Sequence, residues 1–290
     1  MRVVVLGANG QLGSDLIRAA PLSPNLEVVP FYRKDLEVTD FAAIPVALSK
    51  VRFDVLINCT GYHKTDEAER HASQALAVNA TAVKFLAEAC KLRGARLLHI
   101  STDYVFGGDL TRPYRETDSP APLNVYGASK FLGECLAWHA YAEGVIIARV
   151  ASLFGVVGAS GKGGNFVETM LRMGREKGHL RVVKDVTMSP TSTWDAARVI
   201  LRLITERAPA GIYHLVNSGQ ATWFEFAREI IQRAGVAATV EAISSSEYPT
   251  PAIRPPYSVL YNAKASAVTG PIRCWEEALA DYLKEKGHAS

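Results

Sequence analysis

The chain has 290 residues, 48% of them apolar and 21% charged, which excludes a disulfide-stapled miniprotein and a disordered chain. Its 32 basic and 29 acidic residues leave a net charge of +3 without a dense basic run, so a nucleic-acid groove is not expected. The four cysteines lack Cys-x-x-Cys spacing, and we expect neither a targeting leader nor a transmembrane segment. We expect a cytoplasmic protein with free thiols that binds neither nucleic acid nor membrane.

Short β-branched segments alternate with longer helical segments through the first half of the chain. Apolar strands separated by helices are typical of a parallel sheet that is buried on both faces. The pattern predicts an α/β fold, namely a Rossmann-like doubly wound parallel sheet. The expected strands are 3–6, 26–31, 54–58, 97–100 and 145–148, and the expected helices are 12–19, 41–51, 72–92 and 126–142.

After Arg149 this alternation loosens. Helical periodicity returns at 194–205 and 223–234, and a strand-like run lies at 212–216. We predict an NAD(P)-binding domain at 1–150, to which a segment at about 185–215 returns. Residues 151–290 are expected to form mainly a smaller, partly discontinuous C-terminal lobe that binds substrate.

Three glycines follow the first expected strand with the spacing Gly-x-x-Gly-x-x-Gly. They are Gly7, Gly10 and Gly13, and they lie at the start of a helix. Glycines there allow a tight turn and let backbone amides at the positive end of the helix approach a pyrophosphate. The pattern predicts a dinucleotide-binding loop; the alternative is a glycine-rich turn without a ligand.

The end of the second expected strand carries two cations instead of the usual carboxylate. Enzymes that use NAD place an Asp or Glu there to accept hydrogen bonds from the adenosine ribose. Here Arg33 and Lys34 occupy the place. Their charge suits a 2′-phosphate and favours NADPH, with NADH use left open; the alternative is a solvated basic loop.

Two Tyr-x-x-x-Lys pairs occur in the sequence, and their surroundings distinguish them. Tyr126 and Lys130 follow the fourth expected strand, whose end brings Thr102 to the same edge of the sheet. Tyr282 and Lys286 lie in a charged C-terminal helix without such neighbours, and we interpret them as a solvated face.

Thr102, Tyr126 and Lys130 form a candidate catalytic set for reduction of a ketone. The Thr102 hydroxyl and the Tyr126 proton would stabilise the negative charge that develops on the ketone oxygen. Lys130 would lower the pKa of the tyrosine and bind the nicotinamide ribose. The alternative for Thr102 is a strand-end hydroxyl that satisfies the backbone.

These residues resemble the extended short-chain dehydrogenase/reductases, and more closely the dTDP-4-dehydrorhamnose reductase family, over nearly the whole chain. The resemblance implies NADPH-dependent reduction of the C4 ketone of a nucleotide-activated 4-keto-6-deoxyhexose, giving dTDP-L-rhamnose. The motifs that carry it are Gly7 to Gly13, Asn58 to Glu69, Ser101 to Phe106, Pro122 to Gly127, Gly164 to Val167, Tyr248 to Pro251, and Arg254 with Pro255.

The resemblance also implies roles for individual positions. Cofactor contacts are implied at Gly10, Gln11, Leu12, Tyr62 and Lys130. Substrate contacts are implied at Thr102, Asp103, Ser152, Asn165 and Arg254. The Arg254 guanidinium would suit a diphosphate, although a surface ion pair is the alternative; for Asn165 the alternative is a helix N-cap.

Four positions depart from the family pattern, and most of them fall where the substrate pocket is expected. Ser152 replaces a tryptophan and His63 replaces a threonine. Val186 and Met188 replace a glutamine and a glycine. The departures leave the identity of the sugar open.

Other functions remain as alternatives. A reductase for a different NDP-4-ketosugar is one, and a non-catalytic NADP-binding subunit like the regulatory β subunit of methionine adenosyltransferase is another. A dehydratase is disfavoured because Tyr104 stands where such enzymes carry a glutamate after Asp103. No metal-ligand cluster is expected, and a homodimer or an interface ion is left open.

Overall fold

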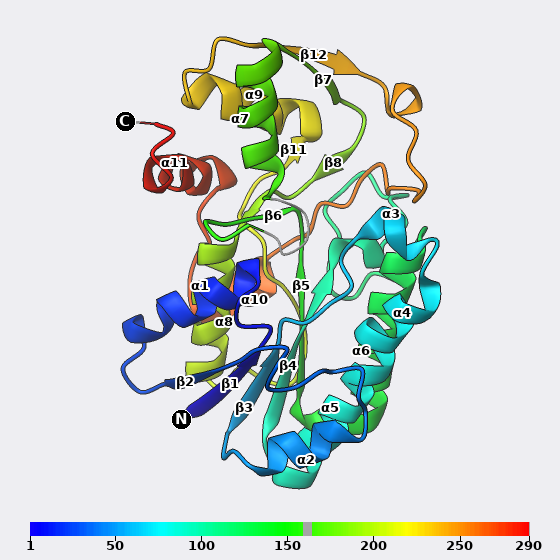
Figure 1. The fold of residues 1–290 in the computed structure, drawn as a ribbon, viewed down its shortest axis with the longest axis vertical. Helices are drawn as coiled ribbons and strands as arrows, with labels where there is room; N and C mark the ends of the chain where they lie inside the picture. The colour runs from blue at the N-terminus through cyan, green and yellow to red at the C-terminus, as the bar shows by residue number, and fades with distance from the viewer. Residues whose placement is uncertain (159–163, 290) are drawn as a thin grey trace.

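The computed structural model describes residues 1–158 and 164–289, and a six-stranded parallel sheet forms its centre (Figure 1). The strand order is β10-β5-β4-β3-β1-β2, so the chain winds outward in both directions from the middle. The sheet confirms the predicted α/β class with its doubly wound parallel sheet. Its strands are β1 (Arg2–Leu6), β2 (Glu27–Phe31), β3 (Val55–Asn58), β4 (Arg96–Thr102), β5 (Val145–Val150) and β10 (Gly211–His214).

Helices cover both faces of this sheet, which explains why its strands are mostly apolar. On β1, Val3 and Val5 pack toward one face while Val4 and Leu6 pack toward the other, and all four are buried. The first face carries α1 (Gln11–Ala19), α8 (Thr193–Thr205) and α10 (Ala263–Thr269). The second carries α2 (Ala43–Ser49), α5 (Ala82–Arg93) and α6 (Val125–Tyr141).

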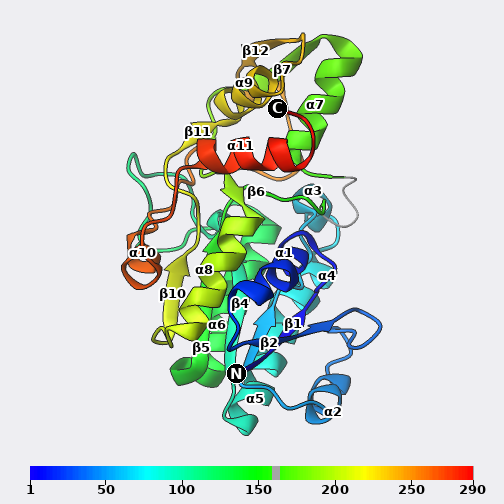
Figure 2. The ribbon, with the colours of Figure 1, turned by 90° about the vertical axis from the view of Figure 1, so that its left-hand side faces the viewer.

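A smaller lobe sits above the carboxyl ends of the strands (Figures 1 and 2). Its core packs the inner faces of three helices together, with Leu171, Phe226 and Tyr282 around Phe154 of a short strand. Its elements are β6 (Leu153–Phe154), α7 (Phe166–Lys177), β7 (His179–Val183), β8 (Thr187–Met188), β9 (Thr191–Ser192), β11 (Ala221–Thr222), α9 (Trp223–Arg233), β12 (Thr239–Ile243) and α11 (Trp275–Glu285).

The chain crosses between the sheet and the lobe repeatedly. After β9 it returns as α8, which packs beside α1, and as β10, which pairs with β5 (Figure 2). It then leaves for β11 and returns once more as α10. The segment at about 185–215, which was predicted to return to the cofactor domain, thus includes β8 and β9, although these strands pair within the lobe. The predicted segment also leaves out α10, which packs on the sheet. The domain boundary at residue 150 stays a prediction.

The helix expected at 72–92 is interrupted. The structure divides it into α4 (Ala72–Leu76), a π-helical turn η2 (Ala77–Thr81) and α5. The Asn79 side chain in the π turn accepts from the Tyr62 N–H at 2.8 Å and donates to the Tyr62 carbonyl at 3.0 Å. The wider turn therefore directs one amide onto the backbone that follows β3, a tertiary contact that periodicity does not reveal.

The remaining elements are short connectors. They are α3 (Thr65–Ala68) and the 3₁₀ turns η1 (Ala20–Leu22), η3 (Asp103–Val105), η4 (Ala142–Gly144) and η5 (Ser245–Glu247). None of the described helices is long and apolar enough to cross a membrane.

Close packing of α6 on the π turn predicts the effect of one substitution. A Cβ at Gly133 would lie 2.0 Å from the Asn79 carbonyl oxygen, which is backbone and cannot move aside. We expect Gly133→Ala to lower the free energy of unfolding by more than about 2 kcal/mol, against a helix-propensity gain of about 1 kcal/mol. Gly174→Ala is the matched control, because the Cβ there would meet side-chain atoms and no backbone: the nearest is the flexible Ile231 Cδ1 at 2.8 Å, followed by Val236 Cγ1 at 3.3 Å and Ala238 Cβ at 3.4 Å. Urea unfolding compares the two; equal losses would contradict the prediction.

Candidate active site

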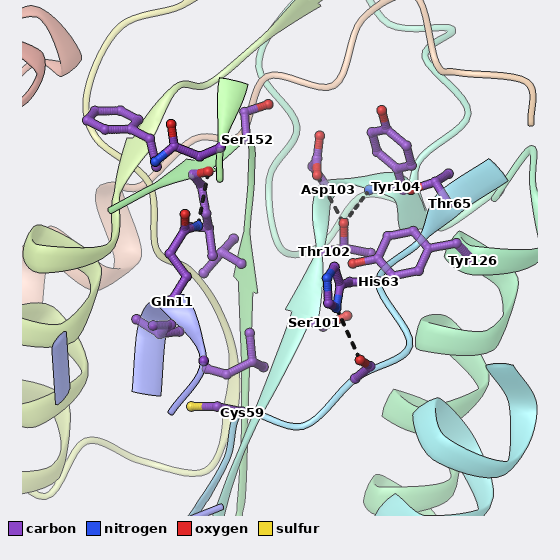
Figure 3. Close-up of a pocket in the computed structure, with 18 of the residues that line it drawn as sticks. Gln11, Cys59, His63, Thr65, Ser101, Thr102, Asp103, Tyr104, Tyr126 and Ser152 are labelled. Carbon is purple, nitrogen blue, oxygen red and sulfur yellow. Dashed lines mark hydrogen bonds between the residues drawn. The ribbon is translucent and has the colours of Figure 1, made fainter. Parts of the chain in front are cut away.

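A pocket of about 450 Å³ opens at the carboxyl ends of β1, β3, β4 and β5, where parallel α/β sheets bind ligands. Gln11 and Ser152 line one side, while Thr102 and Tyr126 line the other (Figure 3). The small lobe contributes an aromatic wall, which consists of Phe166, Trp223 and Phe226. The pocket therefore lies between the sheet and the lobe, and both supply its walls.

The glycine loop after β1 forms the floor at one end of the pocket. Gly7 has φ +74°, a left-handed conformation that favours glycine. A Cβ at Gly13 would lie 2.2 Å from the Gly7 carbonyl oxygen, so the first turn of α1 can only approach the loop without a side chain. Gly7, Gly10, Gln11 and Leu12 line the pocket, and Gly13 packs behind them.

Gln11 connects this loop to the small lobe. Its Nε2 donates to the Leu153 carbonyl at 3.2 Å. Its Oε1 is buried and has no hydrogen-bond partner among the residues that the structure describes. A buried acceptor without a partner costs free energy, so a ligand that donates a hydrogen bond here would be favoured.

Thr102 ends β4 and shares its hydroxyl with the first turn beyond the strand. The hydroxyl accepts from the Tyr104 N–H at 3.2 Å and donates to Asp103 Oδ1 at 3.0 Å (Figure 3). Ser258 donates to the other Asp103 oxygen at 2.6 Å. Burial nevertheless outweighs these hydrogen bonds and raises the pKa of Asp103 to about 6.

Tyr126 and Lys130 lie on the first turns of α6, facing the same pocket. The Asn124 side chain accepts from the Gly127 N–H at 2.8 Å and caps the helix. Burial raises the pKa of Tyr126 to about 12, although the Thr102 hydroxyl lowers it. This direction is opposite to the lowering by Lys130 that the sequence predicted, because burial disfavours the charged phenolate. Burial also disfavours the ammonium and lowers the pKa of Lys130 to about 8.

The other Tyr-x-x-x-Lys pair was wrongly interpreted as a solvated face. Tyr282 is only 4% exposed and packs in the core of the small lobe. Its hydroxyl donates to Glu168 at 2.6 Å and accepts from Asn165 Nδ2 at 3.1 Å. The charged residues of α11 lie on its outer side, whereas Tyr282 belongs to the buried face, which the charge count did not separate.

Asn165 and Arg254 both have partners within the protein. Asn165 caps α7 through its Oδ1, which accepts from the Glu168 N–H at 3.1 Å, and its Nδ2 also donates to the Gly155 carbonyl at 3.0 Å. It still lines the pocket. The Arg254 guanidinium binds the two oxygens of Asp66 at 3.1 and 2.8 Å. An incoming diphosphate at Arg254 would compete with this carboxylate.

Several predicted cofactor residues lie outside the pocket lining. Arg33 is an exposed side chain that pairs with Glu37, and the Lys34 ammonium lies 5.8 Å from the centre of the Tyr32 ring. Tyr62 is held through its backbone by Asn79, while its neighbours Gly61 and His63 line the pocket. Their contacts with a cofactor stay predictions. Within the described ranges, no three His, Cys, Asp or Glu residues are grouped to hold a metal ion.

Comparison with known proteins agrees with this geometry. Residues 1–287 match the family model described as the RmlD substrate binding domain. The chain belongs to this family. It is 37% identical over 290 residues to a dTDP-4-dehydrorhamnose reductase of Mycobacterium tuberculosis, covering 97% of this chain and 92% of that protein. It is 35% identical over 280 residues to a dTDP-4-keto-6-deoxy-D-glucose reductase of Streptomyces niveus, with 96% and 95% covered.

A solved relative shows that the whole fold is shared with the family. The crystal structure of dTDP-4-dehydrorhamnose reductase from Bacillus anthracis, a complex with NADP, superposes with a TM-score of 0.90 at 36% identity. The match covers 98% of this chain and 99% of that one. The suspected family is thereby confirmed.

Two of the four departures from the family pattern line the pocket. Ser152 has φ +42°, a strained backbone conformation for a residue with a side chain. His63 lines the same pocket as Thr102 and Tyr126 (Figure 3), and its Nδ1 lies 3.3 Å from the Gly61 carbonyl oxygen. Val186 and Met188 are buried but do not line this pocket. The expected change of the pocket wall thus comes from Ser152 and His63.

A buried polar layer beneath the pocket was not predicted. His99 Nε2 lies 3.3 Å from Lys130 Nζ, and Glu134 forms a bidentate pair with Arg149 at 2.9 and 2.7 Å. All four side chains are almost completely buried. The available signal was a histidine inside the otherwise apolar run of β4, since a buried polar residue requires a partner.

The buried carboxyl of Asp103 predicts how stability depends on pH. Its folded pKa of about 6 lies above the reference of 3.8, so the stability it contributes is complete below pH 3.8 and is lost as the pH rises through 6. Wild type should lose about 3 kcal/mol of unfolding free energy relative to Asp103→Asn between about pH 3.5 and 7.

Asp118 is the control, because its hydrogen bond with Arg112 lowers its pKa to about 2. Its pH dependence of stability therefore has the opposite sign: the stabilisation is present above pH 3.8 and is lost as the pH falls toward 2. Chemical denaturation of wild type, Asp103→Asn and Asp118→Asn across this pH range measures both effects. A difference between wild type and Asp103→Asn that stayed constant with pH would contradict the assignment.

Proposed function

We propose that the protein uses NADPH to reduce the C4 ketone of a nucleotide-activated 4-keto-6-deoxyhexose. The first candidate reaction converts dTDP-4-dehydro-L-rhamnose to dTDP-L-rhamnose. The observation that carries this proposal is the convergence of Thr102, Tyr126 and Lys130 on one pocket that also contains the glycine loop. Relatives over the whole chain are named reductases of dTDP-4-keto sugars, which supports the same reaction class.

The residues present fit a dinucleotide. Gly13 has no room for a Cβ and Gly7 has a left-handed φ, so the backbone of this loop can approach a pyrophosphate closely at the start of α1. The unpartnered Gln11 Oε1 supplies a buried acceptor beside that loop. Arg33 extends into solvent beyond β2, where it can turn from Glu37 to a 2′-phosphate. The NADP complex of the Bacillus anthracis relative supports this assignment.

The chemistry assigned to the side chains is the transfer of one proton. The bound cofactor supplies the hydride to C4. Tyr126 donates its phenolic proton to the ketone oxygen, and the Thr102 hydroxyl turns from Asp103 to stabilise that oxygen as charge develops. A phenol with a pKa of about 12 keeps its proton at neutral pH, so Tyr126 enters the reaction as the acid. Lys130 would hold the cofactor ribose.

The second candidate is a reductase for another NDP-4-ketosugar. It is favoured by Ser152 and His63, which give the pocket wall a small hydroxyl and an imidazole where the family pattern has a tryptophan and a threonine. Absence of a large ring at Ser152 would leave more space in the pocket, and an imidazole at His63 would offer a polar contact to a sugar hydroxyl. Substitutions at these two positions are the first to make when activities toward different sugar nucleotides are compared.

A panel of 4-keto-6-deoxy sugar nucleotides tests the proposal. NADPH oxidation should require a ketosugar, and Tyr126→Phe should lower kcat by about 10² to 10⁴ because it removes the proton donor. Tyr282→Phe is the matched control from the second Tyr-x-x-x-Lys pair: it should lose thermal stability but keep most of its turnover. Tight NADPH binding without oxidation by any ketosugar would instead favour a regulatory subunit.

The cofactor assignment predicts a selective effect at Arg33. Arg33→Ala should raise the Kd for NADPH by about 10- to 100-fold, since a charge-assisted hydrogen bond contributes about 1.5–3 kcal/mol. The Kd for NADH should not change. Arg233→Ala is the control, because Arg233 also pairs with a glutamate four residues away but lies in α9. Equal weakening of both cofactors by Arg33→Ala would rule out contact with the 2′-phosphate.

A further inference from the structure

His99 lies at the centre of β4, directly below the candidate active site, and its side chain is 0% exposed. Each ring nitrogen faces a different group. Nδ1 lies 3.1 Å from Asn58 Nδ2 at the end of β3, and Nε2 lies 3.3 Å from Lys130 Nζ. A neutral imidazole donates through one nitrogen and accepts through the other, so the two contacts are coupled.

The Asn58 side chain has a fixed orientation. Its Oδ1 accepts from the Thr60 backbone N–H at 3.1 Å and from the Thr60 hydroxyl at 2.6 Å. A backbone N–H can only donate, so the oxygen must face Thr60 and the NH₂ group must face His99. His99 Nδ1 is therefore an acceptor.

This arrangement determines where His99 carries its proton. Complete burial lowers the pKa of His99 well below its usual value, so the ring is neutral. Since Nδ1 accepts from Asn58, the single proton resides on Nε2, which points to Lys130. An amine at Lys130 can accept from Nε2–H, whereas an ammonium presents only donors and has no favourable contact with it.

The other groups around Lys130 do not offset this preference. Glu134, one turn further along α6, directs both oxygens to Arg149, and Ser101 also donates to it. Cys59, beyond β3, is an uncharged thiol because burial raises its pKa to about 12. Tyr126, one turn back on α6, is an uncharged phenol. Among these described neighbours of Lys130, the charged residue is Glu134, and its charge is already balanced by Arg149.

We propose that His99 is a positioning residue that favours the uncharged amine of Lys130 in the free protein, so that in mildly alkaline solution binding of the cofactor takes up a proton at Lys130 Nζ. Ribose hydroxyl oxygens accept hydrogen bonds from an ammonium and favour that form. The step is Lys130–NH₂ plus a proton from solvent giving Lys130–NH₃⁺, with no bond to the cofactor broken. The lowered pKa of Lys130 agrees with this arrangement. The inference rests on the proposed binding of NADPH.

Two experiments test the coupling. NMR of isotope-labelled histidine in the free protein should show His99 as the neutral Nε2–H tautomer. Calorimetry of NADPH binding at about pH 8.5, in buffers with different ionisation enthalpies, should show uptake of about 0.5 to 1 proton, which disappears near pH 6.5 where Lys130 is already charged. His99→Asn keeps an oxygen at the place of Nδ1 for Asn58 but cannot reach Lys130, so it should reduce the uptake at pH 8.5 at least twofold.

His214→Asn is the matched control, since His214 is equally buried in β10 but its Nδ1 faces the Tyr114 carbonyl and it does not contact Lys130. It should leave the proton uptake unchanged. A charged His99, an Nδ1–H tautomer, or equal uptake in wild type and His99→Asn would each overturn the proposal. If NADPH bound without proton uptake, only the coupling would fail, whereas absence of NADPH binding would reject the cofactor assignment itself.

Discussion

Burial of one parallel sheet on both faces is the constraint from which the rest of the structure follows. With α1 and α8 on one side and α2, α5 and α6 on the other, the strands have no solvated face on which to place reactive groups. Polar side chains can leave the apolar interior only where the strands end. Thr102 and the glycine loop stand at such ends, and α6 brings Tyr126 and Lys130 beside them. The location of the pocket is therefore a consequence of the layer architecture.

The same constraint explains why Glu134 and Arg149 form a bidentate ion pair below the pocket. A charge enclosed by apolar residues is tolerated only with good partners, and Glu134 and Arg149 supply them for each other. Lys130 stands at the edge of this layer without a carboxylate of its own. The pKa of such a residue depends strongly on what occupies the pocket, because a new partner shifts the pKa of a buried group more than that of a surface group.

The sheet, its helices and the pocket residues near the strand ends could be predicted from sequence because they follow from local periodicity and turn chemistry. Gly7 and Gly13 are required by the turn itself, and Thr102 follows directly from the position of its strand. Tyr282 was misjudged because its role depends on which face of α11 meets the lobe, a tertiary property. The Asn79 contact that widens the π turn and the His99 contact with Lys130 join elements remote in sequence, so no local pattern contains them.

The repeated crossing of the chain between the sheet and the small lobe also limits how such a protein can change. Neither half is a continuous stretch, since β10, α8 and α10 lie in sequence among elements of the lobe. Exchange of the gene segment beyond residue 150 would remove an edge strand and part of one helical layer along with the substrate-facing wall. Under the proposed function, a new sugar preference is therefore more accessible through single substitutions at pocket-lining positions such as Ser152 and His63 than through recombination of whole segments.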